Sequence, residues 1–542
     1  RLWYTKEFLV CQHLQGSGSS LCIGRETGEL QERTDISWNN EAQVSFVAIL
    51  GILKLVEDQY LVVATKSRKV AVINKLSVYQ VTKCKLLPLR HTKIPGRAEQ
   101  QQLDMVEMIL DIPSLYYSLS FDITNTQNRL QSTTERESRF FWNHYIAEPF
   151  VNNELEKWVT TVIFGFVGYC EKAEALGETF DYILISRRSR MNVGTRFWRR
   201  GSDKFGNAAN SVETEQIVVN NGIISSFVQL RGSIPFTWSQ YPTGKIVPPI
   251  SIKNTDVMDD PAFRLHMNDV KKMYGEPLIV NLVKQRGSEK QLGEMYTSRA
   301  KEMNLEIISF DFHAQCSRAD FSKLKLLEDE VSPFLTRMRY TIGKKEALKQ
   351  SQSGIIRTNC LDNLDRTNVV QTMFASRMVT SMITNRDETA EKLEDYPHFH
   401  FKFKNIWADH ADIISKQYSG TGALNTLFTR TGKTNKMSAI ADKITSATRY
   451  YQNNYCDGYK QDAYDILLGN FRPYEHPDWY HSQTNKFVMM YITTSMVALV
   501  ALSFYLYPVI PLPVLLLMVL VLTFILLFIM NRLLVIDRPQ FS

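Results

Sequence analysis

A cysteine and an arginine lie six residues apart in this sequence, and a hydroxyl follows at once. Cys360, Arg366 and Thr367 belong to GIIRTNCLDNLDRTN (residues 354–368), which has the pattern C-x5-R-[ST]. A cysteine attacks phosphorus as a thiolate, whereas an ordinary thiol, with a pKa of about 8.5, is mostly protonated at neutral pH. A loop of backbone N–H groups at a helix N-terminus lowers such a pKa and binds phosphate, and an arginine fork grips two phosphoryl oxygens. The spacing therefore predicts a phosphate-binding loop with Cys360 as nucleophile, Arg366 as phosphate ligand and Thr367 as a hydrogen-bond donor to the sulfur.

The residues on either side of the loop supply the elements that must position it. Ile355 and Ile356 are typical of the end of a strand. The residues after the loop repeat apolar side chains at helical spacing, namely Val369, Val370, Met373, Phe374 and Met378. Strand, tight loop and helix is the setting in which N–H groups converge on one anion. We expect the phosphate to be surrounded by the loop residues Asn359, Leu361, Asn363 and Leu364.

A second cysteine–arginine pair with the same spacing serves as an internal comparison. Cys84 and Arg90 lie in CKLLPLRH, where Pro88 removes an amide donor, His91 replaces the hydroxyl and no helical pattern follows. We interpret that pair as structural.

Two carboxylates inside the loop are candidates for proton transfer to and from the reacting oxygens. Asp362 and Asp365 would stand beside an anionic phosphate, and mutual repulsion is expected to raise their pKa values. We predict that Asp362 is the general acid and that Asp365 is second choice. Asp365 alternatively orients the loop by accepting backbone or arginine hydrogen bonds.

Further basic and aromatic residues are candidates for binding the rest of a substrate. Arg231 lies in a segment that Gly232 and Pro235 turn, where a sugar ring could stack, and His313 follows a strand end. Lys284 belongs to another basic patch. Six arginines fall within residues 187–200, and they indicate either attraction of an anionic headgroup or a solvated hairpin.

The loop and its surroundings resemble one family. RTNCLDNLDRTNVVQ, together with segments such as RFFWNHYI, QLRGSIPFTWSQ, WADHAD, YSGTGAL and RYYQNNYCDG in the same order, is similar to the Sac-domain phosphoinositide phosphatases. The resemblance implies hydrolysis of phosphatidylinositol 4-phosphate, with the 3-phosphate as a further substrate, through a phospho-cysteine. It also implies an endoplasmic-reticulum and Golgi location with a cytosolic catalytic part. No metal or other cofactor is required, and no nucleic-acid partner is expected.

Three positions depart from the pattern of that family. Asn363 stands where the family commonly has a second cysteine, and Asn425 and Leu427 stand where it has Lys and Asp. These departures leave a catalytically weak phosphoinositide-binding adaptor as one alternative. A membrane-bound protein phosphatase, which would use the same loop, is the other.

Composition and element order bound the fold. The chain has 542 residues, 44% hydrophobic, 22% charged and a net charge of +7, which describes a globular protein of two or three domains with a mild basic bias. Seven scattered cysteines show no metal-ligand spacing and fit a reduced compartment. The first third reads as strands followed by an amphipathic helix over residues 98–118, and strands then alternate with helices. We predict an α/β (α+β) protein with a β-rich domain (1–138) packed on a mixed α/β catalytic domain (139–470).

The C-terminal part of the chain is predicted to enter a membrane. Residues 487–507 and 509–530 are uncharged, each is long enough to span a bilayer as a helix, and prolines separate them. Lys486 precedes the first run and Arg532 follows the second, so the positive-inside rule places both ends in the cytosol. A connecting stretch is expected from about Asp457 to Gln483, with the linker proper at 471–486 and a cytosolic tail at 531–542.

Overall fold

The structure is a computed structural model of the chain. It describes residues 1–12, 18–34, 43–90, 94–252, 261–316, 321–344, 347–385, 391–424, 426–431, 436–479 and 536–540, together with Val514 and Val521. The predicted spans at 487–507 and 509–530 lie outside the described residues apart from those two valines. Across the described ranges, no helix is both long and apolar enough to cross a bilayer.

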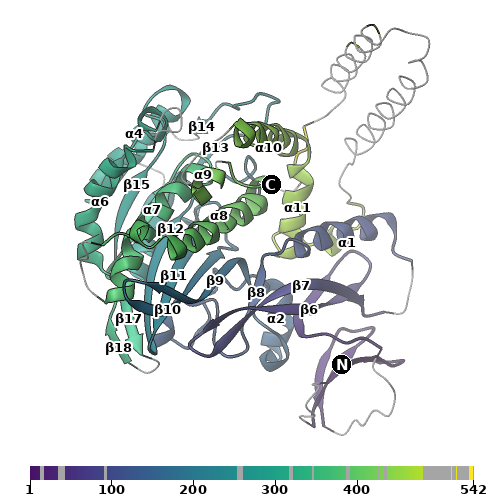
Figure 1. The fold of residues 1–542 in the computed structure, drawn as a ribbon. Helices are drawn as coiled ribbons and strands as arrows, with labels where there is room; N and C mark the ends of the chain where they lie inside the picture. The colour runs from purple at the N-terminus through teal and green to yellow at the C-terminus, as the bar shows by residue number, and fades with distance from the viewer. Residues whose placement is uncertain are drawn as a thin grey trace.

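A small antiparallel sheet opens the chain (Figure 1). Its strands are β1 (Leu2–Tyr4), β2 (Phe8–Gln12), β3 (Ser20–Gly24) and β4 (Leu30–Arg33). Leu9, Cys11, Leu21 and Ile23 alternate along β2 and β3 and are fully buried, so one face of this sheet packs on the residues that follow.

The main sheet of the described residues has 13 strands. Its antiparallel part runs in the order β12 (Ile223–Arg231), β11 (Val212–Asn220), β10 (Glu178–Arg188), β9 (Ile163–Ala175), β8 (Leu115–Tyr117), β7 (Leu76–Pro88), β6 (Gln59–Ile73) and β5 (Ala48–Lys54). On the other side of β12 lie the parallel strands β19 (Gly354–Asn359), β15 (Glu276–Asn281) and β16 (Glu306–Ser309). Short strands complete the described set: β17 (Thr341–Lys344) and β18 (Ala347–Gln350), attached to β12, and the separate pair β13 (Trp238–Ser239) and β14 (Ser251–Ile252).

Helices cover both faces of the parallel strands (Figure 1). Ile356 of β19 belongs to a core with α6 (Leu324–Met338), α7 (Asp365–Thr384) and α8 (Pro397–Ser419). Its neighbour Ile355 faces the other way, toward α3 (Pro261–Tyr274), and α4 (Lys290–Glu302) lies on the same side. The remaining α-helices described are α1 (Arg97–Leu110), α2 (His144–Asn152), α5 (Phe312–Gln315), α9 (Thr426–Thr431), α10 (Lys436–Tyr455) and α11 (Asp457–Leu467).

The mixed α/β class is confirmed, and two local predictions are wrong. The helix expected over 98–118 ends at Leu110, because Pro113 interrupts it and Leu115–Tyr117 joins the sheet as β8. The connecting stretch expected from Asp457 instead begins with α11, whose apolar face is buried against α1. The pairing of β8 with β9 carries one sheet across the predicted boundary at residue 138, and the domain limits stay a prediction.

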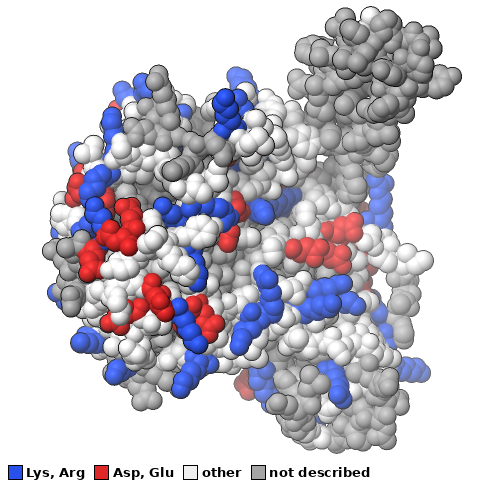
Figure 2. Space-filling model, viewed as in Figure 1, with Lys and Arg blue, Asp and Glu red and all other residues white. Residues whose placement is uncertain are grey.

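The charge on the surface is mixed. Figure 2 shows basic and acidic side chains interspersed over the face that is drawn. Within the arginine-rich stretch, Arg187 and Arg188 are buried, and Arg187 is paired with Glu213 and Glu215. These two arginines are therefore part of the interior rather than of a solvated hairpin or a lipid-facing surface.

Candidate active site

The predicted loop lies where a central parallel strand meets a helix. β19 ends at Asn359, Cys360 follows, and α7 begins at Asp365. The chain turns sharply at Asn363, whose φ of 51° is left-handed, and the Asn363 Oδ1 accepts a hydrogen bond of 3.3 Å from the Cys360 N–H. The strand, tight loop and helix predicted from spacing are thus present, with the α7 N-terminus beside the cysteine.

The cysteine is enclosed. Cys360 is 2% exposed and belongs to the core between the sheet and α7, while Leu361 and Leu364 are also buried. The Cys360 side chain therefore has almost no contact with solvent in this structure.

Arg366 is held by residues that follow the neighbouring strand β15, rather than by the loop. Its Nη1 donates to the Leu282 carbonyl at 3.2 Å and lies 3.3 Å from a carboxylate oxygen of Glu289. Burial by itself lowers the pKa of Arg366, but the negative charges of Cys360, Glu289 and Asp362 outweigh burial and raise that pKa above the ordinary value. The guanidinium is thus firmly charged and within the electrostatic reach of the cysteine.

The expected rise in the pKa of Asp362 is wrong. Arg196 and Arg200 each bind one of its carboxylate oxygens, at 2.7 and 2.6 Å. Burial by itself raises the pKa of Asp362, but these two guanidiniums hold the pKa well below its ordinary value. Asp362 is therefore ionised in this structure. Sequence reasoning missed both partners, although the cluster of arginines at 187–200 contained them.

Asp365 makes the contacts foreseen for an orienting residue. Its Oδ1 accepts a 2.6 Å hydrogen bond from the Leu424 N–H, and its Oδ2 lies 3.1 Å from Arg449 Nη1 of α10. A carboxylate at the first residue of α7 also interacts favourably with the helix dipole. These contacts tie the start of α7 to the segment after α8.

Thr367 does not bind the sulfur in this structure. Its side chain is fully buried, and its Oγ1 has no hydrogen-bond partner among the described residues. The predicted bond to Cys360 is therefore not made.

The other predicted binding residues divide into two groups. Lys284 and His313 lie at the ends of β15 and β16 with Glu289; burial lowers the pKa of His313, and so do the positive charges of Arg366 and Lys284. They are brought together with the loop. The side chain of Asn359 instead bonds to Asn281 at 2.7 Å. Asn425 lies outside the described residues.

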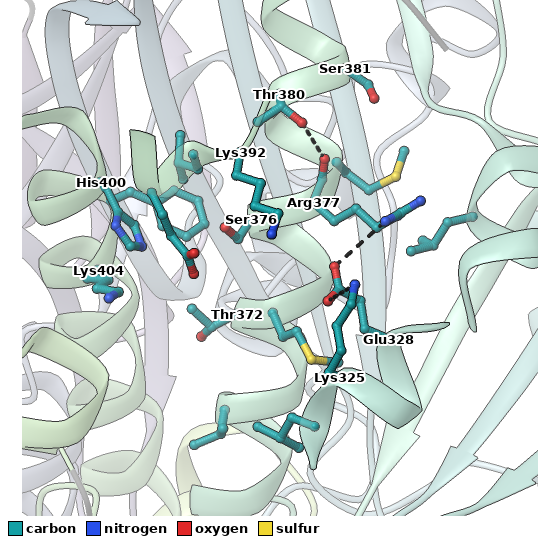
Figure 3. A pocket seen from close by; sticks show the side chains of 18 of the residues that line it. Lys325, Glu328, Thr372, Ser376, Arg377, Thr380, Ser381, Lys392, His400 and Lys404 are labelled. Atoms are coloured by element: carbon teal, nitrogen blue, oxygen red, sulfur yellow. Dashed lines mark hydrogen bonds and ion pairs between the residues drawn. The ribbon is translucent and has the colours of Figure 1, made fainter. Parts of the chain in front are cut away.

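A cavity of about 610 Å³ lies farther along α7, and Figure 3 shows its lining. Its lining side chains come from α6, α7, α8, α9 and the segments that flank them, and they do not include Cys360. Two of its cations are already paired, since Lys325 and Arg377 both lie against Glu328. This cavity is not the site of the loop chemistry.

Comparison with known proteins agrees with the loop. The SacI homology domain matches residues 47–317. The chain is 38% identical over 446 residues to the Danio rerio phosphatidylinositol-3-phosphatase SAC1-A, which covers 78% of this chain and 76% of that protein. It is 33% identical over 462 residues to the Saccharomyces cerevisiae phosphatidylinositol-3-phosphatase SAC1, an alignment that covers 80% of this chain and 73% of that protein. It is 34% identical over 497 residues to the Arabidopsis thaliana phosphoinositide phosphatase SAC7, which covers 87% of this chain and 83% of that protein. The chain belongs to the family of Sac-domain phosphoinositide phosphatases.

Proposed function

We propose that the chain removes the phosphate of phosphatidylinositol 4-phosphate, and also of phosphatidylinositol 3-phosphate, through a phospho-cysteine. The observation that carries the proposal is the loop between β19 and α7, in which Cys360 directly follows the strand and Arg366 lies in the first turn of the helix. Relatives named as phosphatidylinositol-3-phosphatases support the lipid substrate.

The first step of the proposed reaction transfers the phosphoryl group to sulfur. The Cys360 thiolate bonds to phosphorus while the ester P–O bond breaks, and the inositol oxygen takes a proton. Loop N–H groups, the start of α7 and Arg366 stabilise the charge that spreads over the phosphoryl oxygens. Water then breaks the S–P bond and releases inorganic phosphate, and the sulfur leaves as the thiolate. The predicted bond from the Thr367 hydroxyl to this sulfur would require a change from the resting arrangement, in which Thr367 Oγ1 has no partner among the described residues.

Asp362 requires a change of protonation to act as the acid. In this structure Arg196 and Arg200 keep it ionised. An anionic phosphate that enters the loop adds negative charge beside Asp362 and competes for both guanidiniums, and each effect raises the pKa of the carboxyl group. We infer that substrate binding protonates Asp362, which donates its proton to the leaving oxygen and then accepts one from the attacking water.

Phosphate release from a panel of lipids tests the substrate. The purified full-length protein is expected to release phosphate from liposomes containing phosphatidylinositol 4-phosphate, and more slowly from those containing the 3-phosphate. Faster release from phosphotyrosine peptides than from either lipid would instead support a protein phosphatase. Stoichiometric binding of the lipids without phosphate release would support the adaptor.

Anchoring by a two-span hairpin near the endoplasmic reticulum and Golgi is part of the same proposal, since a tethered enzyme meets a lipid substrate at high local concentration. Contacts between the residues before and after the uncharged segment (487–530) support an even number of membrane crossings. Trp479 Nε1 donates to Gln540 Oε1 at 3.3 Å, and the Gln540 N–H donates to Asp462 of α11 at 3.0 Å. Residues before and after the segment therefore lie together on the catalytic body.

Protease treatment of sealed microsomes tests this topology. Tags placed on the catalytic body and at the C-terminal end are both expected to be removed by external protease, while the protein resists alkaline extraction. Protection of the C-terminal tag alone would leave a single crossing and contradict the hairpin.

A further inference from the structure

Arg231 is a buried guanidinium without the partners that a buried charge requires. It is the last residue of β12 and is 1% exposed. Within the part of the chain that the structure describes, its Nε and Nη1 have no hydrogen-bond partner. An uncompensated charge in a protein interior is costly, so a side chain of this kind is retained where another charge meets it.

Other fully buried arginines do not share this feature. Arg187 binds the carboxylates of Glu213 and Glu215. Arg357 donates to His266, Tyr296 and the carbonyl of Ser233 at 2.6–2.9 Å. Among the described residues, Arg196, Arg200 and Arg299 also have one unpaired buried nitrogen each, but all three bind a carboxylate. Arg231 has two unpaired nitrogens, which makes it the exception to be explained.

The position of Arg231 puts it under the loop. β12 and β19 are parallel neighbours, and Arg231 is paired in register with Thr358, two residues before Cys360. Side chains alternate along both strands: Gln229 reaches the Gln371 carbonyl of α7, and Ile356 and Cys360 pack in the core with α7. Arg231 and Cys360 therefore face the same side of the sheet on adjacent strands.

The electrostatics of the site agree with this placement. Burial lowers the pKa of Arg231 to about 10, and the negative charges of Cys360 and Asp365 oppose that shift. On the α8 side stands His410, whose pKa is held well below its ordinary value by burial and by Arg231, so it is neutral. Three acids near the loop are already paired: Glu289 with Arg366, Asp362 with Arg196 and Arg200, and Asp365 with Arg449. Lys284 and His313 lie on the Glu289 side.

We propose that Arg231 is the counter-charge of the Cys360 thiolate and, when substrate is bound, a second guanidinium on the phosphoryl oxygens, approaching from the sheet while Arg366 approaches from α7. This deepens the proposed function and rests on Cys360 as the nucleophile. Because Arg231 faces the same side of the sheet as Cys360, a thiolate formed there would have a positive charge nearby rather than stand as an isolated buried anion. The phosphoryl group then takes over the guanidinium when it enters.

The ionisation of Cys360 tests the proposal without any lipid. The ultraviolet absorbance of the thiolate is followed against pH in the full-length protein, and the same titration of Cys360→Ser is subtracted. An opposite charge within about 4–6 Å typically shifts a pKa by about 1–3 units. Arg231→Met and Arg231→Gln are therefore expected to raise the midpoint of Cys360 by about 1 unit or more, and Arg231→Lys, which keeps the charge, by much less.

Arg357→Met is the matched control, since it removes a buried arginine of β19 that faces the opposite side of the sheet. Its Cys360 midpoint is expected to match that of the wild type. Inorganic phosphate should also bind about tenfold more weakly to Arg231→Met than to the control. An unchanged midpoint in folded Arg231→Met and Arg231→Gln would overturn the proposal. A failure of the proposed function would be detected by a different result: Cys360→Ser would still release phosphate from the lipid.

Discussion

Replacement of Cys360 by Ser is expected to reduce phosphate release from phosphatidylinositol 4-phosphate by at least about 10⁴-fold, because the variant loses the nucleophile of the first step. A serine hydroxyl is far less acidic than a thiol, so the charges that favour a thiolate do not produce an alkoxide at neutral pH. The substitution is small and polar in a site that already holds polar groups, so the fold is expected to survive. Turnover on liposomes and thermal unfolding of the same preparations measure the two effects.

The chain itself offers a control with the same local spacing. Cys84 also has an arginine six residues later, but it lies inside β7, and burial and Asp111 raise its pKa to about 12. It is therefore a neutral thiol without a phosphate loop. Cys84→Ser is expected to keep turnover within about twofold of the wild type. Wild-type turnover in Cys360→Ser, or an equal loss in both variants, would end the assignment of Cys360.

The contrast between the two cysteines explains why the loop was predictable from sequence. Its strand, turn and helix are neighbours along the chain, so spacing and periodicity report on them directly. The residues that control its charges are not neighbours. Arg196 and Arg200 reach Asp362 across 166 and 162 residues, and Arg449 reaches Asp365 across 84. Such partners follow from the tertiary fold, which is why the direction of the Asp362 pKa shift was predicted wrongly.

The fold shows the same division between local and distant information. The strands of the first third and the helix α7 follow from apolar patterns, and their existence was predicted. Strand β8 was not predicted, because its pairing depends on residues far away in the sequence. Leu115–Tyr117 leave the expected helix because β7 and β9 offer them hydrogen bonds on both sides. Likewise α11 looked like a linker because its sequence gives no sign of the apolar surface of α1 that covers it.

Arg366→Lys is expected to lower kcat/KM for phosphatidylinositol 4-phosphate by about 10²–10³-fold, the range for loss of one donor to a developing oxyanion. Lysine keeps the positive charge and can still pair with Glu289, so the resting contacts of the loop remain. It lacks the planar fork that binds two phosphoryl oxygens at once. The effect therefore reports on binding geometry rather than on net charge, and it is measured by steady-state turnover on liposomes.

Arg377→Lys, the same substitution at another arginine of α7, is the control for Arg366→Lys. Arg377 of α7 binds Glu328 and donates to Ser332, away from the loop. Arg377→Lys is expected to leave kcat/KM within about twofold, since an exposed or half-exposed ion pair tolerates a change of cation. A full-rate Arg366→Lys would mean that charge alone suffices at this position. The phosphoryl oxygens would then be held by the loop N–H groups and Arg231, with Arg366 kept chiefly as the partner of Glu289.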